Sequence, residues 1–319
     1  MTTTRQPDLP TFLGASLYVP ANHARLESVL HELVRGGGRG LSRSVIVCLE
    51  DAVREADLEH SVRAASGALR TLSARRDDGD GAPGVHIYVR PRTPELLSRL
   101  LDDEAFHTVH GFVFPKVDIS NVDAWLRAAS THPRAALMPT LETRDAFEPA
   151  RMAALRDHLA PARRQILALR VGGNDLLSLL HVRRPRERTA WDTVLAPVLS
   201  QLLTTFVPWG FSLTAPVFEH ASDLVTLQEE VARDVEAGFI GKTAIHPRQV
   251  PVIDAAFAVT EADLADAHAI LDPGSGAVFG SNGSMCEPAT HAAWARNIQA
   301  RAERFGVRGE RAPILTAVG

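Results

Sequence analysis

Carboxylates stand at the ends of two apolar runs of the sequence and shortly after a third. Glu142 ends "ALMPTLE", Glu50 ends "SVIVCLE", and Asp175 follows "ILALRVG". Glu142 and Asp175 have no cysteine or histidine partner at ligand spacing. Paired carboxylates suit a hard divalent cation that keeps several waters. We therefore predict Glu142 and Asp175 as ligands of Mg²⁺, and Mn²⁺ would use the same ligands.

Two cations end further apolar runs and would complement these acids. Arg90 ends "VHIYVR" and Lys116 ends "GFVFPK". A guanidinium offers a carboxylate a planar fork of donors, so Arg90 is predicted to bind an acidic substrate. Gly172, Gly173 and Asn174 precede Asp175, and glycines let a ligand approach the backbone closely. An acid held by a metal and an arginine, with its carbonyl polarised, implies enolate chemistry.

Lysine is rare in this chain, which makes its positions informative. Of the 34 basic residues only Lys116 and Lys242 are lysines, and both lie beside predicted strand ends. Because arginine serves everywhere else, we expect these two where a compact ammonium on a flexible stem is needed. A metal-free aldolase that uses Lys116 or Lys242 as a Schiff-base amine is therefore a second hypothesis. A barrel that only binds a metabolite or a partner protein is a third.

Short apolar, β-branched runs alternate with longer segments of helical period. The runs span residues 15–20, 44–50, 85–90, 111–116, 136–142, 166–172, 211–217 and 239–245. Helices are predicted at about 22–35, 57–75, 94–101, 119–129, 144–159, 191–207 and 220–237, and the segment 247–258 follows the eighth run. Eight such units predict a (β/α)8 TIM barrel. A doubly wound open sheet would need fewer strands and a glycine-rich fingerprint after the first strand, which is absent.

The barrel prediction brings the polar residues together. In (β/α)8 enzymes the active site lies at the carboxyl ends of the strands. Acids and cations that are far apart in sequence would then form one ring at the barrel mouth. We predict the barrel over residues 11–259, after a polar tail at 1–10. Residues 260–319 are predicted to form a helical extension.

Composition excludes several other classes of function. The chain has 319 residues and a net charge of −4 with both signs interspersed, so it lacks the basic patches of a nucleic-acid-binding protein. No apolar run approaches the roughly 18 residues of a membrane span. The polar N-terminus lacks a signal core, and there are only two cysteines. We therefore expect a cytoplasmic protein without disulfides.

Seven motifs in this order resemble those of the citrate lyase beta-subunit family within the HpcH/HpaI aldolase superfamily. They are "SLYVPA", "VIVCLEDAV", "YVRPRT", "FVFPKV", "LET", "GGNDL" and "GFIGKTAIHPRQV". The resemblance covers residues 12 to 258 and resumes weakly at "GSMCEP". It implies a (β/α)8 barrel and Mg²⁺-dependent lysis or formation of a C–C bond. The implied substrates are 2-keto acids or acyl-CoA thioesters, and the implied assembly is a homotrimer or hexamer.

The resemblance also implies roles for individual residues. The metal acids of the family fall on Glu142 and Asp175, its substrate arginine on Arg90, and its acid after the second strand on Glu50. Its tail acid, which in some members assists thioester enolisation from a neighbouring subunit, falls on Glu287. We therefore expect Glu50, or Glu287 from another copy of the chain, to move or position the proton.

The chain departs from the family pattern at several positions. Cys48 replaces the first acid of the family's Asp-Leu-Glu-Asp motif, Asn174 replaces a carboxylate beside the metal, and Glu287 is one methylene longer than the usual aspartate. A basic run, "HVRRPRER" at 181–188, could hold the phosphates of CoA or form a solvated loop. The pattern therefore indicates a divergent branch of the family.

Overall fold

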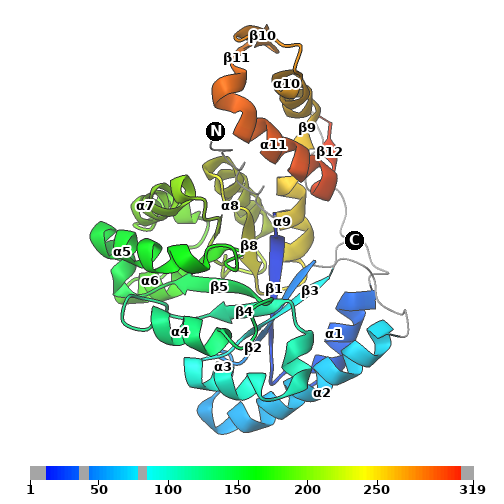
Figure 1. Ribbon diagram of the computed structural model, residues 1–319, viewed down its shortest axis with the longest axis vertical. Helices are drawn as coiled ribbons and strands as arrows, with labels where there is room; N and C mark the ends of the chain where they lie inside the picture. The colour runs from blue at the N-terminus through cyan, green and yellow to red at the C-terminus, as the bar shows by residue number, and fades with distance from the viewer. Residues whose placement is uncertain (1–11, 36–42, 78–84, 310–319) are drawn as a thin grey trace, which may run out of the picture.

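Eight parallel strands form the centre of the protein (Figure 1). The computed structural model describes residues 12–35, 43–77 and 85–309. The strands are β1 (Gly14–Pro20), β2 (Ser44–Cys48), β3 (His86–Arg90), β4 (Gly111–Phe114), β5 (Ala136–Leu141), β6 (Leu169–Val171), β7 (Leu213–Thr214) and β8 (Gly241–Ala244). They pair in the order β7-β6-β5-β4-β3-β2-β1-β8, so β8 returns to β1.

Backbone hydrogen bonds between β7 and β8 close this sheet. Ile240 N donates to Leu213 O at 2.9 Å, and Ala215 N donates to Gly241 O at 2.8 Å. The predicted (β/α)8 barrel is thereby confirmed. β7 is shorter than the predicted run, and Pro216, which has no N–H for a ladder, lies two residues beyond its end.

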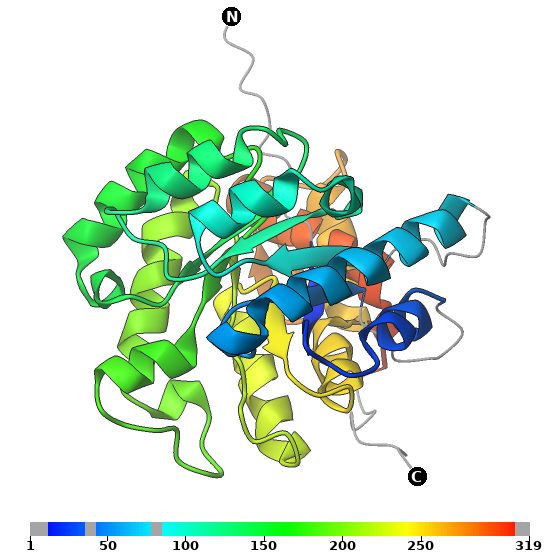
Figure 2. The ribbon, with the colours of Figure 1, turned by 90° about the horizontal axis from the view of Figure 1, so that it is seen from below.

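Nine helices of the described chain lie around the outside of the strands (Figures 1 and 2). They are α1 (Leu26–Arg35), α2 (Leu58–Asp77), α3 (Pro94–Leu101), α4 (Val122–Ala129), α5 (Pro149–Leu159), α6 (Gly173–Leu179), α7 (Ala196–Phe206), α8 (Leu224–Ala237) and α9 (Gln249–Phe257). The helix predicted at 144–159 is interrupted, because Pro149 starts α5 and holds Glu148 extended. The helix predicted at 191–207 begins only at Ala196.

The short helix α6 was not predicted. It follows β6 directly, and its first turn holds Asn174 and Asp175. The sequence "GGNDLLSLL" opens with two glycines, which are typical of a turn, and is too short to show a clear helical period. The consequence is that Asp175 lies on a helix and not on a loop.

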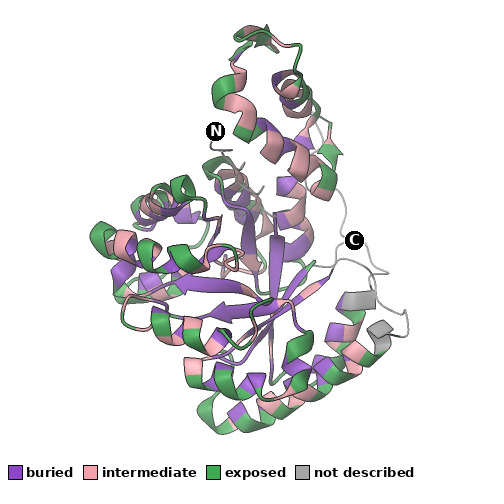
Figure 3. Ribbon diagram, viewed as in Figure 1, coloured by how far each residue is buried: buried purple, intermediate pink, exposed green. Residues whose placement is uncertain are grey.

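The core fills the space between strands and helices, and the strands are mostly buried (Figure 3). Valine, isoleucine, leucine and phenylalanine dominate it, as expected for parallel strands covered on both faces. None of the described helices is both long and apolar enough to cross a membrane. Cys48 and Cys286 are buried free thiols.

The C-terminal extension projects from one end of the barrel, next to α9 (Figure 1). It contains β9 (Val259–Thr260), α10 (Glu261–Leu271), the hairpin of β10 (Phe279–Ser281) and β11 (Ser284–Cys286), α11 (Pro288–Phe305) and β12 (Val307–Arg308). Its own apolar cluster includes Ile270 and Ile298. The ring of Phe305 packs 5.3 Å from that of Phe257 and joins the end of α11 to the barrel. The residues predicted as an N-terminal tail lie outside the described part of the chain.

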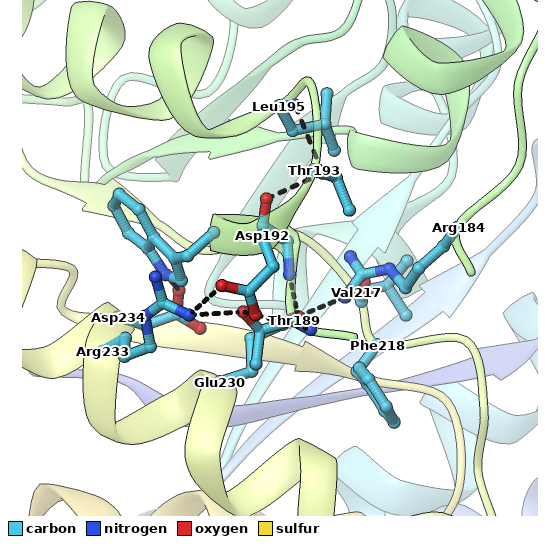
Figure 4. A network of polar contacts seen from close by, with 12 residues as sticks. Arg184, Thr189, Asp192, Thr193, Leu195, Val217, Phe218, Glu230, Arg233 and Asp234 are labelled. Atoms are coloured by element: carbon cyan, nitrogen blue, oxygen red, sulfur yellow. Dashed lines mark hydrogen bonds and ion pairs between the residues drawn. The ribbon is translucent and has the colours of Figure 1, made fainter. Parts of the chain in front are cut away.

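A buried ion network fixes the loop that follows α6 (Figure 4). Lys242 Nζ, which is fully buried, donates to Glu230 and Asp234 of α8 at 2.7 Å each. Arg184 pairs with the same Glu230 and donates to Val217 O at 3.0 Å. Arg184 is only 3% exposed, so this arginine of the basic run 181–188 is neither a solvated residue nor free to hold phosphates. Charges this deep are stable only when paired.

Candidate active site

A cavity of about 320 Å³ opens at the carboxyl ends of the strands. Residues that line it are Tyr18, Pro20, Cys48, Glu50, Asp51, Ala52, Arg90, Thr140, Glu142, Arg170, Val171, Gly172, Gly173, Asn174, Val217, Thr243 and Ile245. Six of the predicted site residues are among them: Glu50, Arg90, Glu142, Gly172, Gly173 and Asn174. Lys116 and Asp175 adjoin this set, with Lys116 Nζ 4.0 Å from Asp175 Oδ1.

Strand β5 delivers Glu142 to the cavity, where it is 3% exposed. Its Oε1 accepts from Arg90 Nη2 at 2.9 Å and from the backbone N of Lys116 at 2.8 Å. Its Oε2 lies against Gly172, where an added Cβ would come within 1.9 Å of this oxygen. The carboxylate can therefore occupy this place only because residue 172 is glycine. Oε2 of Glu142 accepts no hydrogen bond from a described side chain.

The two predicted metal acids are both harder to ionise than free carboxylic acids. Burial raises the pKa of Glu142 to about 7, because Arg90 offsets it only partly and Asp175 adds repulsion. Burial also raises the pKa of Asp175, against the attraction of Lys116. Two acids that destabilise each other's charge would be stabilised by a cation between them. The donors therefore fit Mg²⁺, which takes one or two carboxylates and keeps its waters.

No group of three or more His, Cys, Asp or Glu side chains that could hold a metal occurs among residues 12–35, 43–77 and 85–309. Zinc sites are built from three or four such ligands. The pair of Glu142 and Asp175 fits a cation that completes its coordination with water and substrate oxygens.

Arg90 lies between two acids at the centre of the site. Its Nη2 is 3.1 Å from Glu50 and 2.9 Å from Glu142. Burial would lower the pKa of Arg90, but the ring of Tyr18 and the two carboxylates outweigh it and raise that pKa. Arg90 is thus a permanent cation whose guanidinium is oriented from two sides.

Lys116 is held at the rim by an unusual backbone and by two acids. Its φ of 50° is left-handed, a strained conformation for a residue with a Cβ. Its Nζ donates to Glu50 at 2.5 Å and to Asp51 at 3.1 Å. Burial would lower the pKa of Lys116, but the hydrogen bonds to Glu50 and Asp51 outweigh it and raise that pKa. Lys116 is therefore an ammonium ion and not a free amine.

Some predicted residues lie outside the cavity. Lys242 points from β8 to α8, where the acids of the ion network hold it. Glu287 stands at the N-cap position of α11 in the extension, and its side chain accepts from Thr290 Oγ1 at 3.1 Å. It does not line the cavity of its own chain, so its predicted role would need a second copy.

Sequence reasoning missed Tyr18, Thr140, Arg170 and Thr243, all of which line the cavity. Arg170 left one signal, since it is the single charged residue in the apolar run "ILALRVG". The other three have no signal, because tyrosine and threonine are ordinary strand residues.

A (β/α)8 barrel with acids and a guanidinium at its mouth is the architecture of an enzyme active site. The sequence matches the model of the C–C bond lyase family of the TIM-barrel fold over residues 8–307. The chain belongs to this family and is a carbon–carbon lyase. No curated protein sequence matches it.

Solved structures share the fold. CitE from Mycobacterium tuberculosis, in complex with magnesium, acetoacetate and coenzyme A, has 22% identity and a TM-score of 0.67 over 93% of this chain and 100% of its own. The citrate lyase beta subunit from the same organism, with oxaloacetate and magnesium, has 22% identity and a TM-score of 0.56 over 78% and 97%. RipC from Yersinia pestis has 20% identity and a TM-score of 0.57 over 80% and 99%. The resemblance to the citrate lyase beta-subunit family is confirmed.

Proposed function

We propose that this lyase is Mg²⁺-dependent and acts on a 2-keto acid through an enolate. The observation that carries the proposal is a pair of acids: Glu142, which is buried against the guanidinium of Arg90, and the half-buried Asp175, which opposes the charge of Glu142. The cavity of about 320 Å³ is of a size for a small acid. Neighbours of the same fold are described with magnesium and with oxaloacetate, acetoacetate or pyruvate, which supports the assignment.

Each side chain has a distinct task in this proposal. Glu142 and Asp175 would hold the cation, which when bound would polarise the keto oxygen of the substrate. Arg90 neutralises the negative charge that develops on that oxygen, and does so without reorganising because Glu50 and Glu142 already orient it. Gly172, Gly173 and Asn174 line the wall on which the substrate lies.

Glu50 serves as a positioning residue in this arrangement. It is 5% exposed, and its oxygens accept from Lys116 Nζ at 2.5 Å and from Asp51 N at 2.8 Å, with Arg90 at 3.1 Å. A carboxylate that already accepts from these donors holds the cations of the site in place. Lys116 contributes positive charge at the mouth through the same contacts.

Neither lysine is placed for Schiff-base chemistry. Such an amine must be neutral, and it becomes so in an apolar pocket or beside other cations. Lys116 faces Glu50 and Asp51, which raise its pKa, and Lys242 is enclosed between Glu230 and Asp234. Lys116 is thereby held as an ammonium ion, and Lys242 lies outside the cavity, which supports the metal-dependent mechanism.

Metal removal tests the proposed function. The protein is assayed for C–C cleavage against a panel of 2-keto acids that carry a cleavable bond, and against acyl-CoA thioesters. We expect activity that EDTA abolishes and Mg²⁺ restores, with Mn²⁺ as a substitute, and no adduct on treatment with borohydride plus substrate. Activity that survives EDTA, with a mass adduct on Lys116 or Lys242, would reject the proposal in favour of the Schiff-base mechanism.

We propose further that the protein is a cytoplasmic homotrimer or hexamer in which Glu287 approaches a neighbouring site. The support is its place at the start of α11, on an extension that projects beside the barrel (Figure 1). Light scattering should give a multiple of the 34.5 kDa chain. Glu287→Gln should lower turnover without changing that mass, whereas Glu261→Gln, at the exposed start of α10, should change neither. A monomer in solution would refute the shared site.

A further inference from the structure

The cavity contains a second guanidinium, that of Arg170, which the mechanism above does not use. Arg170 lies on β6 and is 2% exposed. Its Nη2 donates to Thr243 Oγ1 at 2.5 Å, and its Cζ lies 5.4 Å from the centroid of the Tyr18 ring. Arg90 lies 5.9 Å from the same ring. The two guanidiniums therefore contact one tyrosine inside the barrel.

Arg170 lies one layer deeper in the barrel than the predicted metal acids. Its partner in strand register is Thr140 of β5, which precedes Glu142 by two residues. Side chains two residues apart on a strand point to the same face, so Thr140 and Glu142 both face the interior. A ligand held at Glu142 would therefore extend inward toward Arg170.

Within residues 12–35, 43–77 and 85–309, the charge of Arg170 has no acidic partner. Among the described residues Arg170 forms no ion pair, whereas Arg90 pairs with two carboxylates and Arg184 pairs with Glu230. Within the same residues its Nη1 makes only a weak hydrogen bond, to Met138 Sδ at 3.9 Å. A buried charge is costly unless it is paired, so a cation in this position indicates an anion that arrives from outside.

A second observation at the same place points to a ligand. The hydroxyl of Thr140 is buried, lines the cavity and has no hydrogen-bond partner in the part of the chain that the structure describes. Thr140 is 3% exposed, so water competes little for this hydroxyl. Buried polar atoms without a partner are rare in folded proteins. A carboxylate at this position would accept from Thr140 Oγ1 and from the free donors of Arg170 together.

We propose that Arg170 and Thr140 bind a second carboxylate of the substrate, so that the enzyme takes a 2-keto dicarboxylic acid in preference to a monocarboxylic one. The inference rests on the proposed function, because it places the first carboxylate and the keto oxygen at Glu142, Asp175 and Arg90. The guanidinium fork suits a planar carboxylate, and the small cavity limits the length of the diacid. Arg170 is then the residue that determines specificity.

Calorimetry in the presence of Mg²⁺ tests this with three probes: pyruvate, freshly prepared oxaloacetate and 3-phosphonopyruvate. The wild type should bind oxaloacetate about 10- to 100-fold more tightly than pyruvate, the range for hydrogen bonds to a charged group. Arg170→Met should abolish that preference and leave the affinity for pyruvate unchanged. Without ligand, Arg170→Met should melt no lower than the wild type, because methionine fills the space without an unpaired charge.

Arg156→Met is the matched control, since Arg156 also lies against an aromatic ring, 4.0 Å from the centroid of Trp209, away from the cavity. It should keep the wild-type preference. Equal affinity of the wild type for pyruvate and oxaloacetate would overturn the inference. It would also be overturned if Arg170→Met lost its affinity for both acids, or if this variant failed to fold. Tighter binding of 3-phosphonopyruvate than of oxaloacetate would overturn the assignment to a carboxylate. Binding of neither acid would contradict the proposed function itself.

Discussion

Glu142→Gln is expected to abolish tight Mg²⁺ binding while the barrel stays folded. Loss of a group that only supports a metal ligand costs about 10- to 100-fold in affinity, so loss of a ligand should cost at least as much. The measurement is calorimetric titration with Mg²⁺ at pH 8, where a carboxyl with a pKa of about 7 is ionised in the wild type. Asp175→Asn should give the same result, because the cation needs both carboxylates.

The fold of the variant should be unharmed for a physical reason. Burial already opposes the charge of Glu142, and a glutamine Oε1 can still accept from the backbone N of Lys116. The melting temperature of the metal-free variant should therefore equal or exceed that of the wild type. Glu219→Gln is the matched control, since Glu219 also follows a barrel strand but pairs with Arg183 outside the cavity. Wild-type Mg²⁺ affinity in Glu142→Gln would refute the assignment of this ligand.

The barrel and most of the candidate site could be predicted from sequence because both depend on local patterns. Each strand is a short apolar run, and in a (β/α)8 barrel the residue after such a run faces the mouth. The rule finds Glu50, Arg90 and Glu142. Both of these carboxylates contact the guanidinium of Arg90. The apolar run that ends at Glu142 thus delivers a carboxylate to the cavity.

The positions of the other residues could not be predicted, because they depend on contacts between residues that are distant in sequence. Whether Lys242 faced the cavity or the helices depended on its direction from β8, and only the acids of α8 fix that direction. Arg184 looked like one of several surface arginines in a basic run, yet it is buried against Glu230, 46 residues away. Arg170 lies within a strand and not at its end, so a search of strand ends overlooks it. These residues act through packing, which single-sequence periodicity does not encode.

The largest effect on stability is expected at Glu230, the acid shared by two buried cations. It accepts from Lys242 Nζ at 2.7 Å and from the backbone N of Ala190 at 2.5 Å. It also pairs with Arg184, which Figure 4 shows beside it. The side chains of Glu230, Lys242 and Arg184 are all buried. Removal of one partner from a buried ion pair leaves an uncompensated charge, which costs about 3–5 kcal/mol. Glu230→Ala should therefore lower the free energy of unfolding in urea by this amount.

The matched control is Glu229→Ala, one residue earlier on α8 and exposed, which should change the free energy of unfolding by less than about 0.5 kcal/mol. Glu230→Gln should fall between the two, because an amide oxygen can still accept but no longer carries charge. Arg184 and Ala190 lie on the loop after α6, the helix that carries Asp175, so Glu230→Ala should also weaken Mg²⁺ binding before the barrel unfolds. If Glu230→Ala were as stable as Glu229→Ala, the loop would be held by packing alone, and the ion network would have no part in positioning Asp175.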